Sequence, residues 1–104
     1  CVEYFIDKND NLFVNEIAPR VHNSGHLTIN AYNISQFENH IRAVCGLDKV
    51  ETKKLHNAKM INLIGEDILV YRNKIFKDNE FFFDYQKDTV EKKRKMGHLT
   101  TIKK

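Results

Sequence analysis

The first 17 residues contain two apolar, β-prone runs with a polar interruption between them. Residues 2–6 and 12–17 flank a segment, residues 7–11, that consists of Asp, Lys and Asn. Asp and Asn favour turns because their side chains hydrogen-bond to nearby backbone groups. The pattern therefore predicts a β-hairpin with its turn at residues 7–11.

Pro19 follows the second apolar run, and it cannot donate to a strand ladder because it has no N–H. Residues 20–33 are polar and contain Gly25. We expect this stretch to be a long ordered loop, and loops of that length inside a compact domain are often functional.

The clearest helix is predicted to begin at Ser35. Ser35 and Glu38 have the spacing of a capping box, and Gly46 stands where a helix can end on a left-handed residue. Three apolar residues recur at helical spacing and are expected to form a buried stripe: Phe37, Ile41 and Val44.

The second half of the chain reads as short strands around one helix. Residues 59–64, 80–85 and 96–102 are predicted to be strands, residues 68–76 a short helix, and residues 87–95 a charged bend. The expected core, besides the helical stripe, consists of Met60, Ile61, Leu63 and Phe81 to Phe83.

Composition limits the possible classes of protein. The chain has 104 residues, of which 41% are hydrophobic and 30% charged, and this suits a small globular unit without two independent cores. No apolar run approaches the roughly 20 residues of a membrane span. Cys1 and Cys45 form no metal-type pair or disulfide framework. We therefore expect a cytoplasmic protein without a membrane partner. Because a strand is already predicted at residue 2, we also expect further protein upstream.

Two glutamates are candidates for a magnesium site. Glu3 and Glu16 lie on the two predicted hairpin strands, and Asn15 is next to Glu16. Two carboxylates at close range repel each other unless a cation lies between them, and Mg²⁺ prefers oxygen ligands. The alternative is a pair of surface glutamates without a specific role, which is the more common situation.

The segment after the second strand concentrates donors that suit an anion. Arg20, His22 and Asn23 are followed by Ser24, Gly25 and His26. A guanidinium beside amide and imidazole groups suits a small planar oxyanion. We reject a zinc site, because the histidines lack companions at metal-ligand spacing.

These motifs resemble the carboxyaminoimidazole ribonucleotide synthetase family. The segments that carry the resemblance span nearly the whole chain: Val2-Glu3-Tyr4-Phe5, Asn15-Glu16-Ile17-Ala18-Pro19-Arg20, His22-Asn23-Ser24-Gly25-His26, Ser35-Gln36-Phe37-Glu38, His40-Ile41-Arg42-Ala43 and Lys95-Met96-Gly97-His98. The resemblance implies an α+β fold. Residues 1–48 would be the C-terminal part of an ATP-grasp domain, an antiparallel sheet with a packed helix, and residues 49–104 a small β-rich C-terminal domain.

The resemblance also implies an ATP-dependent carbon–nitrogen ligase of purine biosynthesis. Such an enzyme activates bicarbonate as carboxyphosphate and carboxylates aminoimidazole ribonucleotide. By resemblance, Glu3 and Glu16 are magnesium ligands, and Asn15 and Glu16 contact the ATP end. By the same resemblance, bicarbonate and carboxyphosphate are bound by Arg20, His22 and Asn23. The phosphate of the ribonucleotide is bound by Lys87 and Arg94. Family members tend to form dimers.

The chain lacks a Gly-rich phosphate loop and has only four glycines, so we expect it to be inactive without an N-terminal part. Two alternatives remain open. The sister formate-dependent glycinamide ribonucleotide transformylase typically has His-Asp-Thr-Gly where this chain has His22-Asn23-Ser24-Gly25. A small basic nucleic-acid module would use the lysines of residues 87–104, but this segment has no interleaved aromatic residue and the net charge is only +3. We therefore expect no nucleic-acid partner. For Arg94, a solvated basic bend is as good an interpretation as a phosphate contact.

Overall fold

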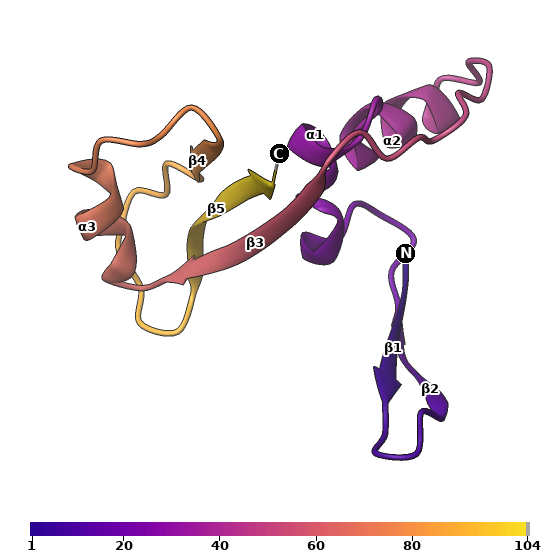
Figure 1. Cartoon of the computed structure of the whole chain (residues 1–104), viewed down its shortest axis with the longest axis horizontal. Helices are drawn as coiled ribbons and strands as arrows, with labels where there is room; N and C mark the ends of the chain where they lie inside the picture. The colour runs from indigo at the N-terminus through magenta and orange to yellow at the C-terminus, as the bar shows by residue number, and fades with distance from the viewer. Residues whose placement is uncertain (104) are drawn as a thin grey trace.

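The computed structural model describes residues 1–103 and has two antiparallel sheets with short helices between and beside them (Figure 1). The elements are β1 (Val2–Ile6), β2 (Leu12–Ile17), the 3₁₀ turn η1 (Asn23–Gly25), α1 (Thr28–Ala31), α2 (Gln36–Val44), β3 (Asn57–Ile64), α3 (Asp67–Arg72), β4 (Glu80–Asp84) and β5 (Lys95–Lys103). The predicted α+β class is confirmed. Within residues 1–103, no helix has the length and apolar composition that crossing a membrane requires.

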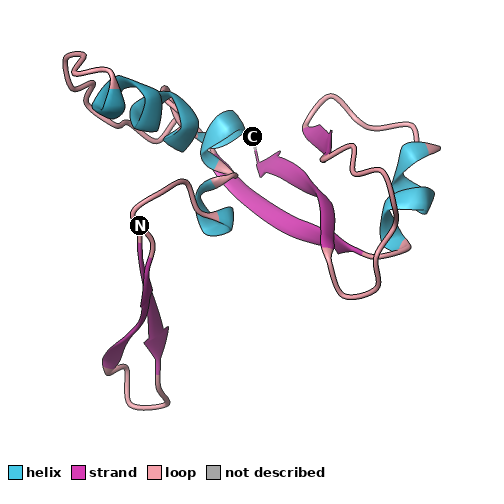
Figure 2. Cartoon of the chain, turned by 180° about the vertical axis from the view of Figure 1, so that it is seen from behind, coloured by secondary structure: helices cyan, strands magenta, loops and turns pink. Residues whose placement is uncertain are grey.

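The hairpin β1–β2 forms as predicted and projects away from the rest of the chain (Figure 2). Its turn is organised by Asp7, whose Oδ1 accepts hydrogen bonds from the backbone N–H groups of Asn9 and Asn11 at 2.8 and 2.9 Å. The side-chain hydrogen bond from Asn11, with the two backbone bonds, lowers the pKa of Asp7. From the turn, the register pairs Tyr4 with Val14, and a register shift between Glu3 and Tyr4 then places Glu3 opposite Glu16.

The predicted long ordered loop over residues 20–33 contains two short helical elements that the sequence did not predict, η1 and α1. Both are single turns, so they show no helical periodicity in the sequence. Thr28 Oγ1 donates to the Gly25 carbonyl at 2.6 Å, and this local bond joins the two turns.

Helix α2 begins where the capping box predicts, with Ser35 Oγ accepting from the Glu38 N–H at 3.1 Å. Gly46 follows the helix end with a φ of 65°. The expected burial of its apolar stripe was wrong: Phe37, Ile41 and Val44 are 37%, 56% and 66% exposed. The helix projects outward, so among residues 1–103 no helix or strand covers that face.

The second sheet has the order β3–β5–β4, with β5 in the centre. Its core consists of Leu63, Ile68 and Met96, so α3 packs on the sheet through Ile68. Of the residues expected in the core, Leu63 is buried, Met60 and Phe81 to Phe83 are half-buried, and Ile61 is 38% exposed. Ile61 was therefore wrongly assigned.

Gly97 permits the close packing of this sheet. A Cβ at this position would lie 2.4 Å from the Phe83 carbonyl oxygen and 2.8 Å from Ile68 Cδ1. Only glycine allows β4 and α3 to approach β5 at this point.

The first sheet is connected to the second through α1. The carbonyl of Ala31 accepts from the N–H groups of Leu55 and His56 at 2.8 and 3.1 Å, and the carbonyl of Lys53 accepts from the Asn33 N–H at 3.1 Å. These bonds hold the segment before β3 against the end of α1, and thereby place the loop after β2 beside the three-stranded sheet.

Candidate active site

Glu3 and Glu16 face each other across the hairpin, because they are paired in its antiparallel register. Their carboxylate oxygens and a ring nitrogen of His22 all lie within 4.8 Å of one another. Asn15 Nδ2 donates to Glu3 Oε1 at 2.5 Å. The structure therefore brings Glu3, Asn15, Glu16 and His22 together as one acidic cluster, and its two carboxylates remain accessible at 37% and 51% exposure.

His22 belongs to this acidic cluster through its own hydrogen bonds. Its Nδ1 accepts from the backbone N–H of Ser24 at 3.4 Å and lies 2.8 Å from Ser24 Oγ. The hydrogen-bond network thus assigns the ring proton to Nε2, which lies 2.6 Å from Glu16 Oε1 and 3.9 Å from Glu3 Oε2. Sequence spacing alone did not place His22 beside these carboxylates.

The hydrogen bond of the Arg20 side chain is to its own loop and not to the acidic cluster. Its Nη1 donates to the Val21 carbonyl at 3.0 Å, and the side chain is exposed. The residue borders an open cavity of about 410 Å³ lined by Cys1, Ala18, Pro19, Arg20, Val21, Gln36, Asn39 and His40. The cavity contains a guanidinium and an imidazole at its edge, so it can accept a small anion.

Asn23 opens η1 and points toward the second sheet. Burial raises the pKa of the Tyr85 hydroxyl, and a hydrogen bond with the Asn23 side chain opposes that shift. Asn23 therefore connects the loop after β2 to the segment after β4, and it is not part of the acidic cluster.

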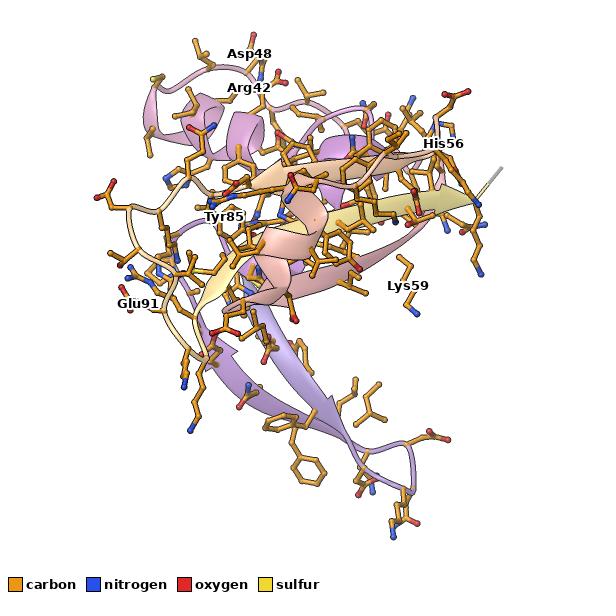
Figure 3. All side chains as sticks on the ribbon, turned by 90° about the vertical axis from the view of Figure 1, so that its left-hand side faces the viewer. Arg42, Asp48, His56, Lys59, Tyr85 and Glu91 are labelled. Atoms are coloured by element: carbon orange, nitrogen blue, oxygen red, sulfur yellow. The ribbon has the colours of Figure 1, made fainter. Side chains whose placement is uncertain are left out.

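A buried aromatic and imidazole cluster lies behind the loop, and sequence reasoning missed it. His98 is 1% exposed; its Nδ1 lies 2.9 Å from the Tyr85 hydroxyl, and its ring stacks on Phe83 with centroids 4.6 Å apart. The His26 ring lies 5.4 Å from His98 and 5.1 Å from Phe37. Tyr85, which is half-buried, is labelled in Figure 3. His98 belongs to the segment Lys95-Met96-Gly97-His98 that carries part of the family resemblance, but its neighbours in the sequence give no sign of its partners.

Burial determines the charge of both histidines. It lowers the pKa of His98 to about 4, with a further contribution from His26. Burial also lowers the pKa of His26, followed by the nearby charges of His22 and Lys95. Both rings are therefore neutral near pH 7.

Comparisons with known proteins agree with this geometry at the level of the family. Residues 1–37 match the model of the ATP-grasp domain, and residues 58–104 match that of the phosphoribosylaminoimidazole carboxylase C-terminal domain. The N5-carboxyaminoimidazole ribonucleotide synthase of Bacillus subtilis is 43% identical over 99% of this chain. The synthase of Staphylococcus haemolyticus is 47% identical over 97% of this chain. In sequence, the chain belongs to the N5-carboxyaminoimidazole ribonucleotide synthase family.

Solved structures of this family share the fold. N5-carboxyaminoimidazole synthetase from Staphylococcus aureus complexed with ADP superposes with a TM-score of 0.89 at 43% identity over 98% of this chain. The Aspergillus clavatus synthase, in complex with ADP and 5-aminoimidazole ribonucleotide, gives a TM-score of 0.87 at 32% identity over 98% of this chain. The chain spans 27% and 28% of the two synthase sequences, and 28% and 29% of the two crystallised chains.

The two residues that the family resemblance connects with substrate phosphate lie on the bend before β5. Lys87 Nζ donates to the Lys95 carbonyl at 2.7 Å and lies 5.8 Å from the centroid of the Tyr85 ring. Arg94 Nη1 pairs with Glu91 Oε1 at 2.5 Å, and Glu91 lies at the outer edge of the molecule (Figure 3). Lys87 is thus next to the buried cluster, whereas Arg94 has a carboxylate partner on the surface.

Proposed function

We propose that this chain supplies the magnesium and bicarbonate end of an active site that carboxylates aminoimidazole ribonucleotide at the expense of ATP. The observation that carries the proposal is the convergence of Glu3, Glu16 and His22 at the end of the hairpin in a chain of this family. The coarser conclusion, that the chain is part of a purine-biosynthetic ATP-grasp ligase, rests on the matches to the two family models and to the synthases.

The acidic cluster fits Mg²⁺ by its chemistry. Glu3 and Glu16 supply oxygen atoms, which Mg²⁺ prefers, and their exposure leaves room for waters and nucleotide phosphates. His22 donates to one oxygen of Glu16 and leaves the other oxygen free to bind a cation. Bound Mg²⁺ would offset the negative charge that develops on the transferred phosphoryl group.

The remaining residues would bind and orient the small substrate. Arg20, with Asn23, would hold bicarbonate and then carboxyphosphate by donating hydrogen bonds, and His22 would keep Glu16 in place. A bicarbonate oxygen attacks the γ-phosphorus of ATP, and the bond to ADP breaks. The exocyclic amine of the ribonucleotide then attacks the carboxyl carbon and loses a proton, while phosphate leaves with an oxygen that came from bicarbonate.

Lys87 and Arg94 would hold the phosphate of the ribonucleotide. Lys87 is the stronger candidate, because its ammonium is fixed only by a backbone carbonyl and an aromatic ring and can turn to a substrate. Arg94 would first have to leave Glu91. The same proposal includes a domain boundary between residues 48 and 49. It also includes a homodimer of the complete protein and a cytoplasmic location.

The 104 residues alone are expected to bind ATP weakly and to be inactive, because they contain no glycine-rich phosphate loop. The proposal is therefore tested on the complete protein, with ATP, the ribonucleotide and either ¹⁸O-bicarbonate or formate. We expect product only with bicarbonate, and ¹⁸O in the released phosphate. Use of formate, or phosphate without the label, would refute the proposed reaction.

A matched variant tests the assignment of Arg20. Arg20→Ala removes the guanidinium that borders the cavity, so we expect a higher KM for bicarbonate with little change in the KM for the ribonucleotide. Unchanged bicarbonate kinetics would remove Arg20 from the proposed pocket.

A further inference from the structure

We infer that Gln36 is a positioning residue that fixes His22, and through it Glu16, by holding the backbone of His22 with its side-chain amide. The inference rests on the proposed function, because it gives Gln36 a task in the same site. Gln36 is the first residue of α2, 14 positions after His22, so no local sequence motif predicts their contact.

The amide of Gln36 binds both backbone groups of His22. Gln36 Oε1 accepts from the His22 N–H at 2.9 Å, and Gln36 Nε2 donates to the His22 carbonyl at 2.7 Å. A primary amide has a donor and an acceptor in the geometry that this pair of bonds needs. With both backbone groups held, the His22 ring is directed to Glu16 at 2.6 Å.

The second hydrogen of the amide fixes a neighbouring ring. Because Oε1 already accepts from His22, the nitrogen of Gln36 is the atom 2.6 Å from His26 Nδ1, so it must donate there. His26 therefore carries its proton on Nε2. Protonation of Nδ1 would set two donors against each other, so the Gln36 amide requires this tautomer of His26.

Gly25 makes room for the amide. A Cβ on Gly25 would lie 2.5 Å from Gln36 Oε1 and 2.7 Å from Gln36 Cδ. The obstacle is the end of a flexible side chain, so Gly25→Ala would displace the amide without rebuilding the fold. Gly25 and Gln36 thus act as one unit, the Gly25–Gln36 clamp, and their substitutions should not have independent effects.

The test uses the complete protein with Gln36→Ala, Gln36→Glu and Gly25→Ala. Loss of a group that orients a ligand residue typically costs about 10- to 100-fold in activity. We expect kcat to fall by about that factor in each variant, with the KM for the ribonucleotide and the thermal unfolding midpoint nearly unchanged. The Gly25→Ala/Gln36→Ala double variant should lose no more than either single variant.

The matched control is Glu38→Gln on the same helical turn. The carboxylate of Glu38 pairs with Arg42, 3.6 Å away on the surface, and the backbone N–H of Glu38 keeps the Ser35 cap. We expect wild-type kinetics. Normal kcat in Gln36→Ala, or losses that multiply in the double variant, would overturn the inference.

A spectroscopic measurement separates this inference from the proposed function. In ¹⁵N-histidine-labelled protein, we expect an unprotonated Nδ1 on His26 in the wild type and changed ring-nitrogen shifts for His22 and His26 in Gln36→Ala. If the complete protein does not carboxylate the ribonucleotide, the proposed function fails, and the tautomer still decides whether the clamp exists. A protonated Nδ1 in the wild type would overturn the clamp even in an active enzyme.

Discussion

The hairpin and the three-stranded sheet are built on different principles. In β1 and β2 every residue except the half-buried Glu3 is exposed, whereas five consecutive residues of β5, positions 96–100, are buried. The hairpin is held by its ladder and its Asp7 turn, and the three-stranded sheet by packing around Met96. A two-stranded hairpin alone is marginally stable in water.

This difference between the hairpin and the three-stranded sheet places the candidate site in one region and most of the stabilising packing in the other. The acidic cluster is carried by the exposed hairpin and the loop behind it, where a side chain can change without opening a cavity. The three-stranded sheet carries the buried His98 and the core, and a change there disturbs packing. Substitutions in the two regions should therefore affect different measurements.

The largest expected effect is on activity, in the hairpin. Glu16→Gln keeps the shape of the side chain and a weaker contact to His22, but removes the charge that would bind Mg²⁺. We expect kcat to fall by about 10²- to 10³-fold, the scale on which a single electrostatic contact to the reacting group acts. The thermal unfolding midpoint should not change, because this side chain is 51% exposed.

Turnover of the complete protein at saturating Mg²⁺ and its thermal unfolding are the two measurements for Glu16→Gln. The matched control is Glu38→Gln, which neutralises an exposed glutamate outside the acidic cluster. Equal activity of the two variants would deny Glu16 its role. A large fall in the unfolding midpoint would show that the hairpin is less independent of the core than its exposure indicates.

The intermediate effect is a pH dependence of stability, in the sheet. His98 is neutral and buried when folded, with its pKa lowered to about 4, and titrates near 6.5 when unfolded. Between these values only the unfolded chain binds the proton, so stability is full above about pH 6.5 and falls as the pH decreases toward 4. The loss can reach up to about 3 kcal/mol.

The thermal unfolding midpoint of the complete protein at about pH 7.5 and about pH 5 measures this effect. His98→Gln can still meet the Tyr85 hydroxyl but cannot take up a proton, so we expect a smaller difference between the two midpoints than in the wild type. His40→Gln, at a half-buried histidine that lines the cavity, is a matched control and should keep the full difference. Equal pH dependence in all three proteins would contradict the assignment to His98.

The sequence predicted local interactions well and interactions between distant residues poorly. The Asp7 turn, the Ser35 cap and the strands of the second sheet follow from neighbouring residues, and the structure contains them. The hairpin predicted that Glu3 and Glu16 lie near each other, but the register set by its turn would place Glu3 opposite Asn15, and the register shift between Glu3 and Tyr4 that pairs Glu3 with Glu16 was not predicted.

What could not be predicted depends on the path of the chain between elements. The contact of His22 with Glu16, the amide of Gln36 on His22, and the meeting of His26 with His98 join residues from separate elements. The amphipathic pattern of α2 predicted a buried face but could not say what would cover it, and its apolar residues are exposed.

The smallest expected effect tests how much the turn contributes to the position of the carboxylates, beside the register shift between Glu3 and Tyr4. Asp7→Ala removes the two acceptor bonds that hold the backbone of Asn9 and Asn11, although the apolar strands remain. The register of β1 and β2 would then be less firmly fixed, and Glu3 and Glu16 would spend less time opposite each other. We expect a few-fold loss in kcat and a weaker apparent affinity for Mg²⁺, with no change in the pH dependence that His98 confers. Lys8→Ala, in the same turn but outside these bonds, should behave as the wild type. If Asp7→Ala is fully active at limiting Mg²⁺, contacts outside the turn must fix the register, and the hairpin would depend on packing as the three-stranded sheet does.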